Sequence, residues 1–121
     1  MGIISTNEGD LSFDSVDQAI EIMRGMSREM SEAWISGDNP YPCLAICING
    51  EYAAVNYFQD EDGEICLSYN AENQNEVKFK AGGEEWKPDP DAVISFEDAI
   101  KCVEEFLNTG AQPSNIKWQH M

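Results

Sequence analysis

Apart from its carboxylates, this 121-residue chain has few side chains that could perform acid–base or nucleophilic chemistry. Its single histidine, His120, lies one residue from the C-terminal end, where chains tend to fray, so it is a poor candidate for a general base. Without a placed base, neither a Ser-His-Asp triad nor a Cys-His pair can be assembled. The glycines follow neither a P-loop nor a dinucleotide-binding pattern. We therefore predict that the chain is not an enzyme and uses no cofactor.

The cysteines show no metal-binding spacing; they are Cys43, Cys47, Cys66 and Cys102. No C-x-x-C pair occurs, and one histidine does not provide a zinc spacing. Cys43 and Cys47 lie on one expected strand, about 13 Å apart by strand rise, which is too far for a disulfide. We expect reduced, buried thiols in a cytoplasmic protein.

Carboxylates are the abundant group, because 23 Asp and Glu against seven Lys and Arg give a formal net charge of −16. They cluster in two expected loops, the first containing Asp60, Glu61, Asp62 and Glu64. The second contains Glu84, Glu85, Asp89 and Asp91, with Trp86 among them. The first loop faintly resembles part of a calcium site but lacks its helix, third ligand position and distal glutamate. No two acids stand out as a glycosidase pair, and we predict no metal site.

This charge would repel nucleic acid and anionic membranes and attract basic proteins. Trp86 and Tyr41 add aromatic residues of the kind that dominate binding energy at interfaces. We therefore predict a protein-binding surface made of the two acidic loops and Trp86. Two alternatives remain: a small acidic hydrolase or ligand-binding domain, and an adaptor whose acidity serves only solubility. The oligomeric state is left open.

Length and composition predict one domain, residues 1–121, with an ordinary 42% of hydrophobic residues. No apolar run approaches the ~20 residues of a membrane span, and the N-terminal segment lacks the pattern of a signal peptide. We expect no membrane association and no export by a signal peptide.

A β-hairpin is expected around Asn49-Gly50, the strongest short hairpin signal, between two apolar runs. With these two residues as the loop, Ile46 faces Ala53 and Leu44 faces Val55. One face of the pair then carries Leu44, Ile46, Ile48, Ala53, Val55 and Tyr57.

A second turn then leads to a third strand. We expect a three-residue loop, 61–63, with Gly63 in a left-handed bulge position. This loop would place Ile65, Leu67 and Tyr69 on the same aliphatic face. A two- or four-residue loop would turn the three side chains to the other face.

Two helices have clear start signals. Ser15 and Gln18 form a capping box, and Ser95 is followed at the same spacing by Asp98. The apolar stripe of the first helix is Val16, Ala19, Ile20, Met23 and Met26, and that of the second is Phe96, Ala99, Ile100, Val103 and Leu107. The first helix should end between residues 24 and 28, and the second at Gly110.

The remaining segments are short. Residues 32–36 read as a strand, or alternatively as a continuation of the first helix through Met30 and Trp34. Brief extended pieces are expected at residues 77–79, 93–94 and 116–118, and at Ile3-Ile4, whereas residues 84–91 read as an acidic edge loop broken twice by proline. Together the elements predict an α+β fold, an antiparallel meander sheet with two main helices packed on one face.

The chain resembles the first-numbered Imm family of immunity proteins of bacterial polymorphic toxin systems over most of residues 12–118. The resemblance is carried by Asn49-Gly50 followed by V-N-Y-F at 55–58, by V-I-S-x-E-x-A at 93–99, and by F-x-x-T-G-x-x-P-x-x-I-x-W at 106–118. Trp118 matches a tryptophan near the C-terminal end of family members.

The resemblance implies an α+β immunity protein that binds a cognate toxin domain with a basic surface. Members are typically encoded beside toxins, often of the deaminase superfamily, that act on nucleic acid. A toxin of this kind must present a basic cleft, which an acidic inhibitor could occupy in place of phosphates. The motif residues are mostly structural, so the resemblance assigns no binding residue.

Overall fold

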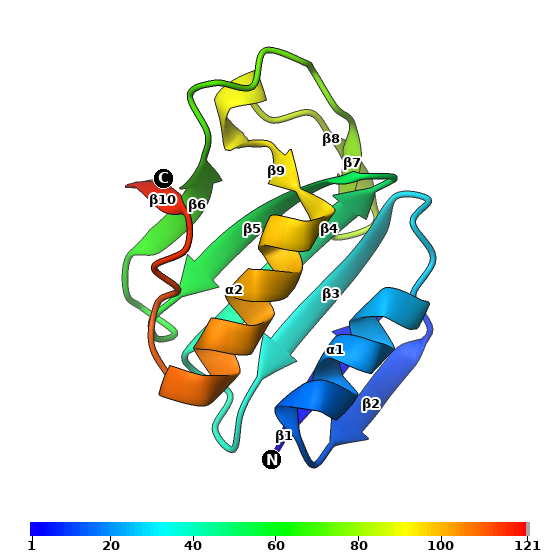
Figure 1. Cartoon of the computed structure of the whole chain (residues 1–121), viewed down its shortest axis with the longest axis vertical. Helices are drawn as coiled ribbons and strands as arrows, with labels where there is room; N and C mark the ends of the chain where they lie inside the picture. Colours follow the sequence, from blue (N-terminus) through cyan, green and yellow to red (C-terminus); the bar gives the residue numbers. More distant parts are fainter. Residues whose placement is uncertain (121) are drawn as a thin grey trace.

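Two helices lie on one face of a large antiparallel sheet in the computed structural model, which describes residues 1–120 (Figure 1). The helices are α1 (Val16–Gly25) and α2 (Phe96–Thr109), and a short 3-10 helix, η1, covers Pro90–Ala92. The strands of the main sheet are β1 (Gly2–Thr6), β2 (Gly9–Phe13), β3 (Ser31–Ser36), β4 (Cys43–Asn49), β5 (Tyr52–Phe58), β6 (Ile65–Tyr69), β9 (Ile94–Ser95) and β10 (Lys117–His120). A separate hairpin pairs β7 (Phe79–Ala81) with β8 (Glu84–Trp86).

The main sheet has the order β10-β6-β5-β4-β3-β1-β2, and β9 pairs with the beginning of β5. This arrangement confirms the predicted α+β fold with a meander at its centre. Residues 31–36 form a strand, so the alternative of a longer first helix is wrong. Strand β2 lies at the sheet edge and was not predicted, because its sequence, GDLSF, has little apolar alternation.

Both helices begin and end as their local sequences predict. The Ser15 hydroxyl accepts a hydrogen bond from the backbone N–H of Gln18, and the Ser95 hydroxyl accepts one from Asp98, each at 3.1 Å. Gly110 adopts a left-handed conformation at φ 70°, from which its N–H donates to the Phe106 carbonyl. Such a conformation favours glycine, so α2 ends at this residue.

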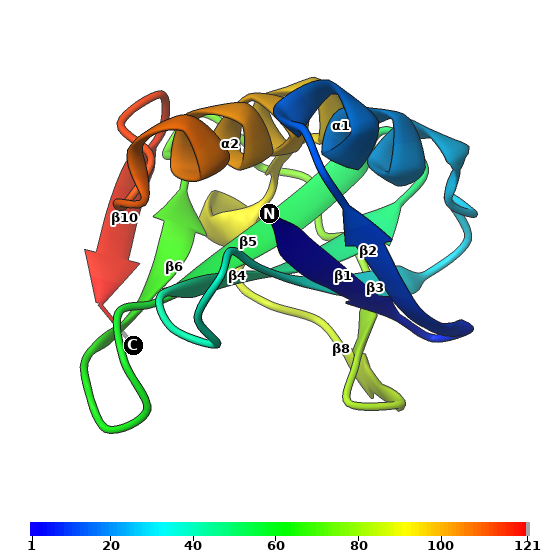
Figure 2. The same ribbon diagram turned by 90° about the horizontal axis from the view of Figure 1, so that it is seen from below.

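The two helical stripes pack on one side of the sheet, called here the covered face, and enclose the main core (Figure 2). Sheet residues of this core include Ile4, Ile35, Leu44, Ile46, Ile48, Ala53, Val55 and Tyr57. The predicted aliphatic face of β4 and β5 is therefore confirmed. Outside the core, Arg24 of α1 donates two hydrogen bonds, of 2.8 and 2.9 Å, to the Glu97 carboxylate of α2 and joins the helices.

The facing partners across the β4–β5 hairpin differ from the prediction by two residues. Asn49 pairs with Tyr52, Ile46 with Val55, and Leu44 with Tyr57, so Gly50 and Glu51 form the loop. Gly50 alone supplies the positive φ, 63°. Asn49 stays in the strand, and its side-chain amide donates to the Lys78 carbonyl at 2.7 Å. A shift of two residues preserves the faces, which is why the core prediction survives.

The predicted orientation of β6 is wrong. Cys66 pairs with Tyr57 on the covered face, whereas Ile65 and Leu67 lie on the other face beside Phe58 and Asn56. The connecting loop spans residues 59–64, and Gly63 is not left-handed there. Any side chain at Gly63 would instead collide with the Asp60 carboxylate, which lies directly against the position that a Cβ atom would take. Gly63 is therefore not a bulge glycine, and a larger residue there would displace the Asp60 side chain.

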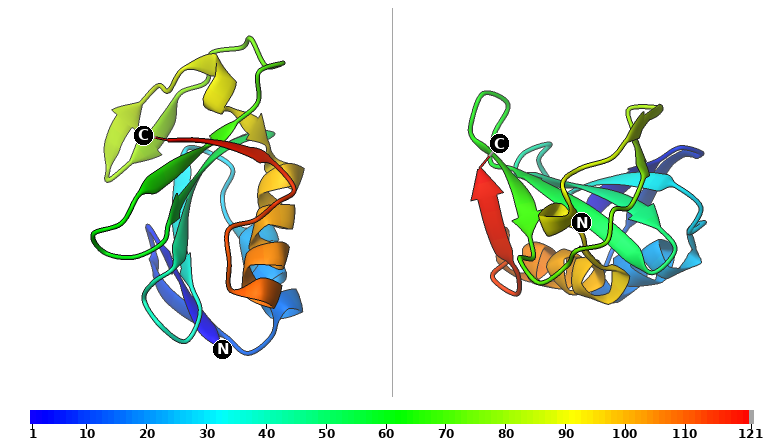
Figure 3. Two further views of the ribbon diagram at one scale, coloured as in Figure 1. Left: turned by 90° about the vertical axis from the view of Figure 1, so that its left-hand side faces the viewer. Right: turned by 90° about the horizontal axis from the view of Figure 1, so that it is seen from above.

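The acidic segment 84–91 is not all loop as predicted, because residues 84–86 form β8 and pair with β7. The hairpin folds onto the other face of the sheet, on the side away from the helices (Figure 3). Phe79, Val77 and Val93 there cover Cys47 and Ala54 in a second, smaller core. The apolar contacts of Phe79 and Trp86 therefore stabilise a strand at residues 84–86, although prolines follow at positions 88 and 90.

Candidate binding surface

The two predicted acidic regions project from the same side of the sheet, opposite the helices. In Figure 2 the β5–β6 loop and the β7–β8 hairpin both point away from α1 and α2. The left view of Figure 3 shows the same arrangement, with sheet surface between the two projections. Segments that are well separated in the sequence thus border one surface.

The β5–β6 loop, residues 59–64 and called here the acidic loop, carries uncompensated negative charge. Its acids Asp60, Glu61, Asp62 and Glu64 are all exposed. Asp60 accepts a hydrogen bond from the Asp62 N–H at 3.1 Å, which orders the tip. Glu64 lies 3.5 Å from His120, and within residues 1–120 no lysine or arginine pairs with the loop. The acidic loop therefore presents a field that a basic partner could neutralise.

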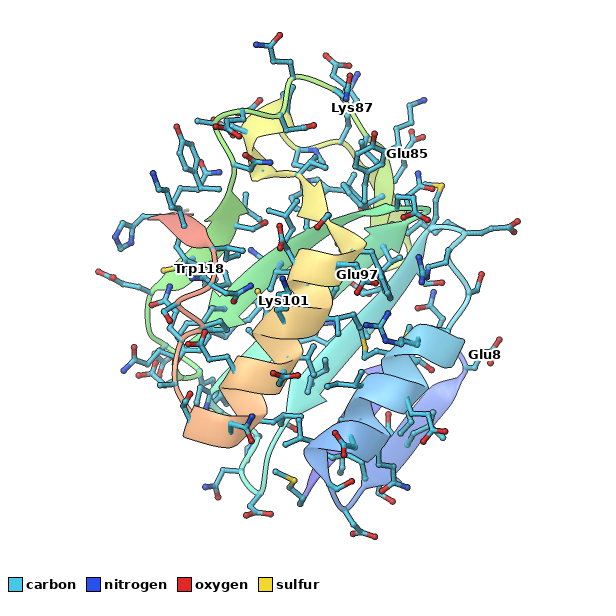
Figure 4. All side chains as sticks on the ribbon, viewed as in Figure 1. Glu8, Glu85, Lys87, Glu97, Lys101 and Trp118 are labelled. Carbon is cyan, nitrogen blue, oxygen red and sulfur yellow. The ribbon has the colours of Figure 1, made fainter. Side chains whose placement is uncertain are left out.

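The hairpin is electrostatically balanced instead. Glu85 pairs with Lys78 at 3.5 Å, and Lys87 pairs with Glu76 at 3.2 Å. Residues 76–87 hold three glutamates and three lysines, so the charges cancel. The Glu85 and Lys87 side chains extend outward at this end of the molecule in Figure 4. Glu84 is exposed as well.

Trp86 has a structural contact, because its ring packs against Phe79 with centroids 6.2 Å apart and is half-buried. Asp89 is exposed just before η1. Asp91 lies apart from the hairpin: its carboxylate accepts from the Gln119 amide of β10 at 3.4 Å, and its carbonyl accepts from the Asn70 N–H. The second predicted cluster is therefore divided between two places.

Between the acidic loop and the hairpin lies an uncovered part of the sheet, called here the open face. Strand pairing aligns its residues in two cross-strand rows. The first row is Ile3, Ser36, Cys43, Phe58 and Ile65, and the second is Ser5, Trp34, Ala45, Asn56 and Leu67. Leu67, at the end of the second row, is itself buried.

Two aromatic rings cross the centre of the open face. Trp34 of β3 and Phe58 of β5 stack with centroids 5.1 Å apart and planes inclined at 29°. They meet above the intervening strand because its residues here, Cys43 and Ala45, are small. The rings leave each of these two residues only 5% exposed, while Trp34 itself is 40% exposed.

Trp34 was not predicted from the sequence as a binding residue. Ala33 and Ile35 on either side of it are buried, so strand alternation directs Trp34 outward. A tryptophan at an outward position of a strand is a recognisable signal for a contact surface. Tyr41, selected as an aromatic anchor, is half-buried and lines a shallow hollow with Leu107 and Gly110.

The titratable groups with shifted pKa values include two buried cysteines and two carboxylates of α2. Burial raises the pKa of the Cys47 thiol to about 12, and burial likewise raises the pKa of Cys102 to about 12, so both stay protonated and unreactive at neutral pH. All four cysteines are buried free thiols, as predicted. The side-chain hydrogen bonds from Arg24 lower the pKa of Glu97, and those from Ser114 lower that of Glu105. A general acid requires the opposite shift.

Within the described residues no three His, Cys, Asp or Glu side chains gather closely enough to hold a metal ion. Across the same residues no helix is long and apolar enough to cross a membrane.

A family model described as immunity protein Imm1 matches residues 12–120. The match confirms the family resemblance drawn from the hairpin, helix and C-terminal motifs. None of the curated proteins matches the chain.

Proposed function

The chain belongs to the Imm1 family of immunity proteins, and from this premise we propose that it binds one cognate bacterial toxin domain and neutralises it stoichiometrically, without catalysis. An immunity protein has a toxin as its partner, so the chemistry of the surface should complement that toxin. No hydrolytic centre is needed for such a role, because occupying the toxin is sufficient.

The partner in this proposal is a basic domain that acts on nucleic acid, a deaminase or a nuclease. The observation that carries it is the net charge of −16 together with the acidic loop, which forms no ion pair with a lysine or arginine of residues 1–120. A domain that holds a phosphate backbone presents clustered Lys and Arg. Acidic side chains can steer such a domain into contact and can take the positions of phosphate groups.

The proposed contacts are the residues Asp60, Glu61, Asp62, Glu64, Glu84, Glu85, Trp86, Asp89 and Asp91. Their existing ion pairs indicate how much each of them should contribute to binding. The acidic loop has no Lys or Arg partner in the described chain and would contribute most to steering, whereas Glu85 is already paired with Lys78. We place the protein in the cytoplasm of a bacterium that uses a polymorphic or contact-dependent toxin system, where nucleic acid would need protection.

Co-expression tests this function. The chain is produced together with the toxin domain encoded by the neighbouring gene, and growth is compared with that of cells carrying the toxin and an unrelated acidic protein. We expect growth only with the immunity protein, and a one-to-one complex by size exclusion with light scattering. Growth arrest together with separate elution of the two proteins would contradict the proposal.

A further inference from the structure

We infer that the open face, centred on the Trp34–Phe58 stack, is the surface on which the toxin domain docks. This inference rests on the proposed function and locates its main contact on the sheet, with the acidic loop at its border. The nine charged and aromatic residues above then surround or flank the contact and do not form its centre.

Exposed apolar surface is concentrated here. Ile3, Trp34 and Ile65 are 44%, 40% and 37% exposed, and all three lie in the two rows of the open face. A connected group of large apolar side chains on a sheet surface commonly marks an interaction site. Tryptophan is also the residue type most enriched among side chains that dominate binding energy.

The fold keeps this surface uncovered. The β7–β8 hairpin lies over the neighbouring part of the same face, but it is held in place by two contacts. Glu32 of β3 accepts a hydrogen bond from the Gly82 N–H at 3.2 Å, and Asn49 of β4 binds the Lys78 carbonyl. The hairpin is therefore anchored beside the open face and leaves Trp34 exposed.

The charge around the open face selects a basic occupant. The acidic loop begins directly after Phe58 and ends directly before Ile65, so its four carboxylates border the first row. The two rows contain no lysine or arginine. A basic domain placed on the rings would bring its cations beside these carboxylates, which is the complementary arrangement.

A second copy of this chain is a poorer occupant of the same surface. Each copy carries a net charge of −16, so a dimer through the open face would bring two acidic loops toward one interface. Like charges close together across an interface oppose association. The same charges attract a basic toxin domain.

The test compares Trp34→Ala with Leu11→Ala, both measured against the neighbouring-gene toxin domain by biolayer interferometry. Leu11 is a matched control because it is 48% exposed but lies on edge strand β2, opposite buried Ile4. We expect Trp34→Ala to raise Kd by about 30-fold or more, mainly through faster dissociation. Leu11→Ala should change Kd by less than about threefold.

Ser36→Arg provides a second variant that removes no apolar contact. It places a long cation in the first row, where it should obstruct a basic partner and raise Kd at least as much. A native circular dichroism spectrum and a cooperative thermal unfolding transition would confirm that both variants fold.

The outcomes separate the two proposals. If the wild-type chain binds the toxin and both open-face variants bind within about threefold of it, the docking surface is wrong and the proposed function stands. If the wild-type chain neither binds nor protects, both proposals fail. A wild-type dimer that Ser36→Arg dissociates, with toxin binding unchanged, would assign the open face to a second copy and overturn the inference.

Discussion

The two faces of the sheet use the same strands for different purposes. The covered face alternates large aliphatic residues, such as Leu44, Ile46 and Ile48, that are fully buried under α1 and α2. The open face alternates small residues with two stacked rings and is bordered by carboxylates that form no ion pair with a lysine or arginine of residues 1–120. Strand alternation therefore places a packed core on one face of these strands and, in the docking inference above, the contact with the toxin domain on the other.

The largest contrast should appear when one apolar residue is truncated on each face. Ile46→Ala on the covered face creates a cavity in a packed core and should lower the free energy of unfolding by about 4 kcal/mol. Trp34→Ala should lower it by about 1 kcal/mol, because the ring is already partly in water and mainly loses its stack on Phe58. Urea unfolding followed by fluorescence measures both. Equal losses would show that the open face is also part of the stabilising core.

The second prediction compares the stability lost when a serine is changed to alanine on each face, Ser68 on the covered face and Ser36 on the open face. Ser68, fully buried, accepts a hydrogen bond from the Val55 N–H at 3.1 Å and donates to the Ala92 carbonyl at 2.6 Å. The Ser68 hydroxyl takes the place of a backbone acceptor for the Val55 N–H. Val55 lies between the part of β5 that pairs with β9 and the part that pairs with β6. Ser68→Ala leaves both groups without this partner and should cost about 2 kcal/mol in urea unfolding.

Ser36→Ala on the open face is the matched control, and it should change stability by less than about 0.5 kcal/mol. If Ser68→Ala lowers the free energy of unfolding as little as Ser36→Ala does, water has taken the place of the Ser68 hydroxyl.

The third prediction compares the two acidic regions beside the open face. Changing Asp60, Glu61, Asp62 and Glu64 to their amides should slow association with the toxin domain about 10-fold at low salt and flatten its salt dependence. Changing Glu84 and Glu85 to glutamine should slow it only about twofold, since lysines on the same hairpin already offset those charges. Stopped-flow association at low and high salt gives both values. A larger effect from the hairpin pair would move the main electrostatic contact there.

Local rules predicted those parts of the fold that depend on neighbouring residues. Ser15, Ser95 and Gly110 cap their helices as the sequence indicates, because each cap is satisfied within a few residues. The faces of β4 and β5 followed from alternation alone. The partner register did not, because Asn49 is held in the strand by Lys78, 29 residues away. Such a contact leaves no trace in the turn sequence.

Strand β6 shows why the third strand could not be oriented from its apolar residues. Leu67 and Ile65 are larger than Cys66, yet Cys66 faces the covered core, where it pairs with Tyr57, whose ring lies beside that of Trp118. Figure 4 labels Trp118, which β10 supplies from the far end of the chain. Composition located the acidic loop correctly as an exposed region. Composition could not identify Trp34 as a candidate binding residue, because its exposure depends on which strands of the sheet remain uncovered.

The smallest effect concerns the ion pair outside the covered face, between Arg24 of α1 and Glu97 of α2. Hydrogen bonds from Arg24 lower the pKa of Glu97 in the folded state. The contribution to stability is therefore fully present above the unfolded carboxyl pKa, about 4.3, and is lost as the pH falls through the lower folded value. Because both side chains are largely exposed, the effect should be small.

Wild-type, Glu97→Gln and Glu104→Gln chains are compared by their urea midpoints between pH 6 and pH 3. Glu104 lies on the same helix and forms no ion pair within the described residues, so its variant controls for the loss of one acid. On acidification the wild type and Glu104→Gln should lose slightly more stability than Glu97→Gln, which has already lost the pair. If all three chains follow one pH profile, the helices are held on the sheet by apolar packing alone, and the difference between the two faces is entirely one of burial.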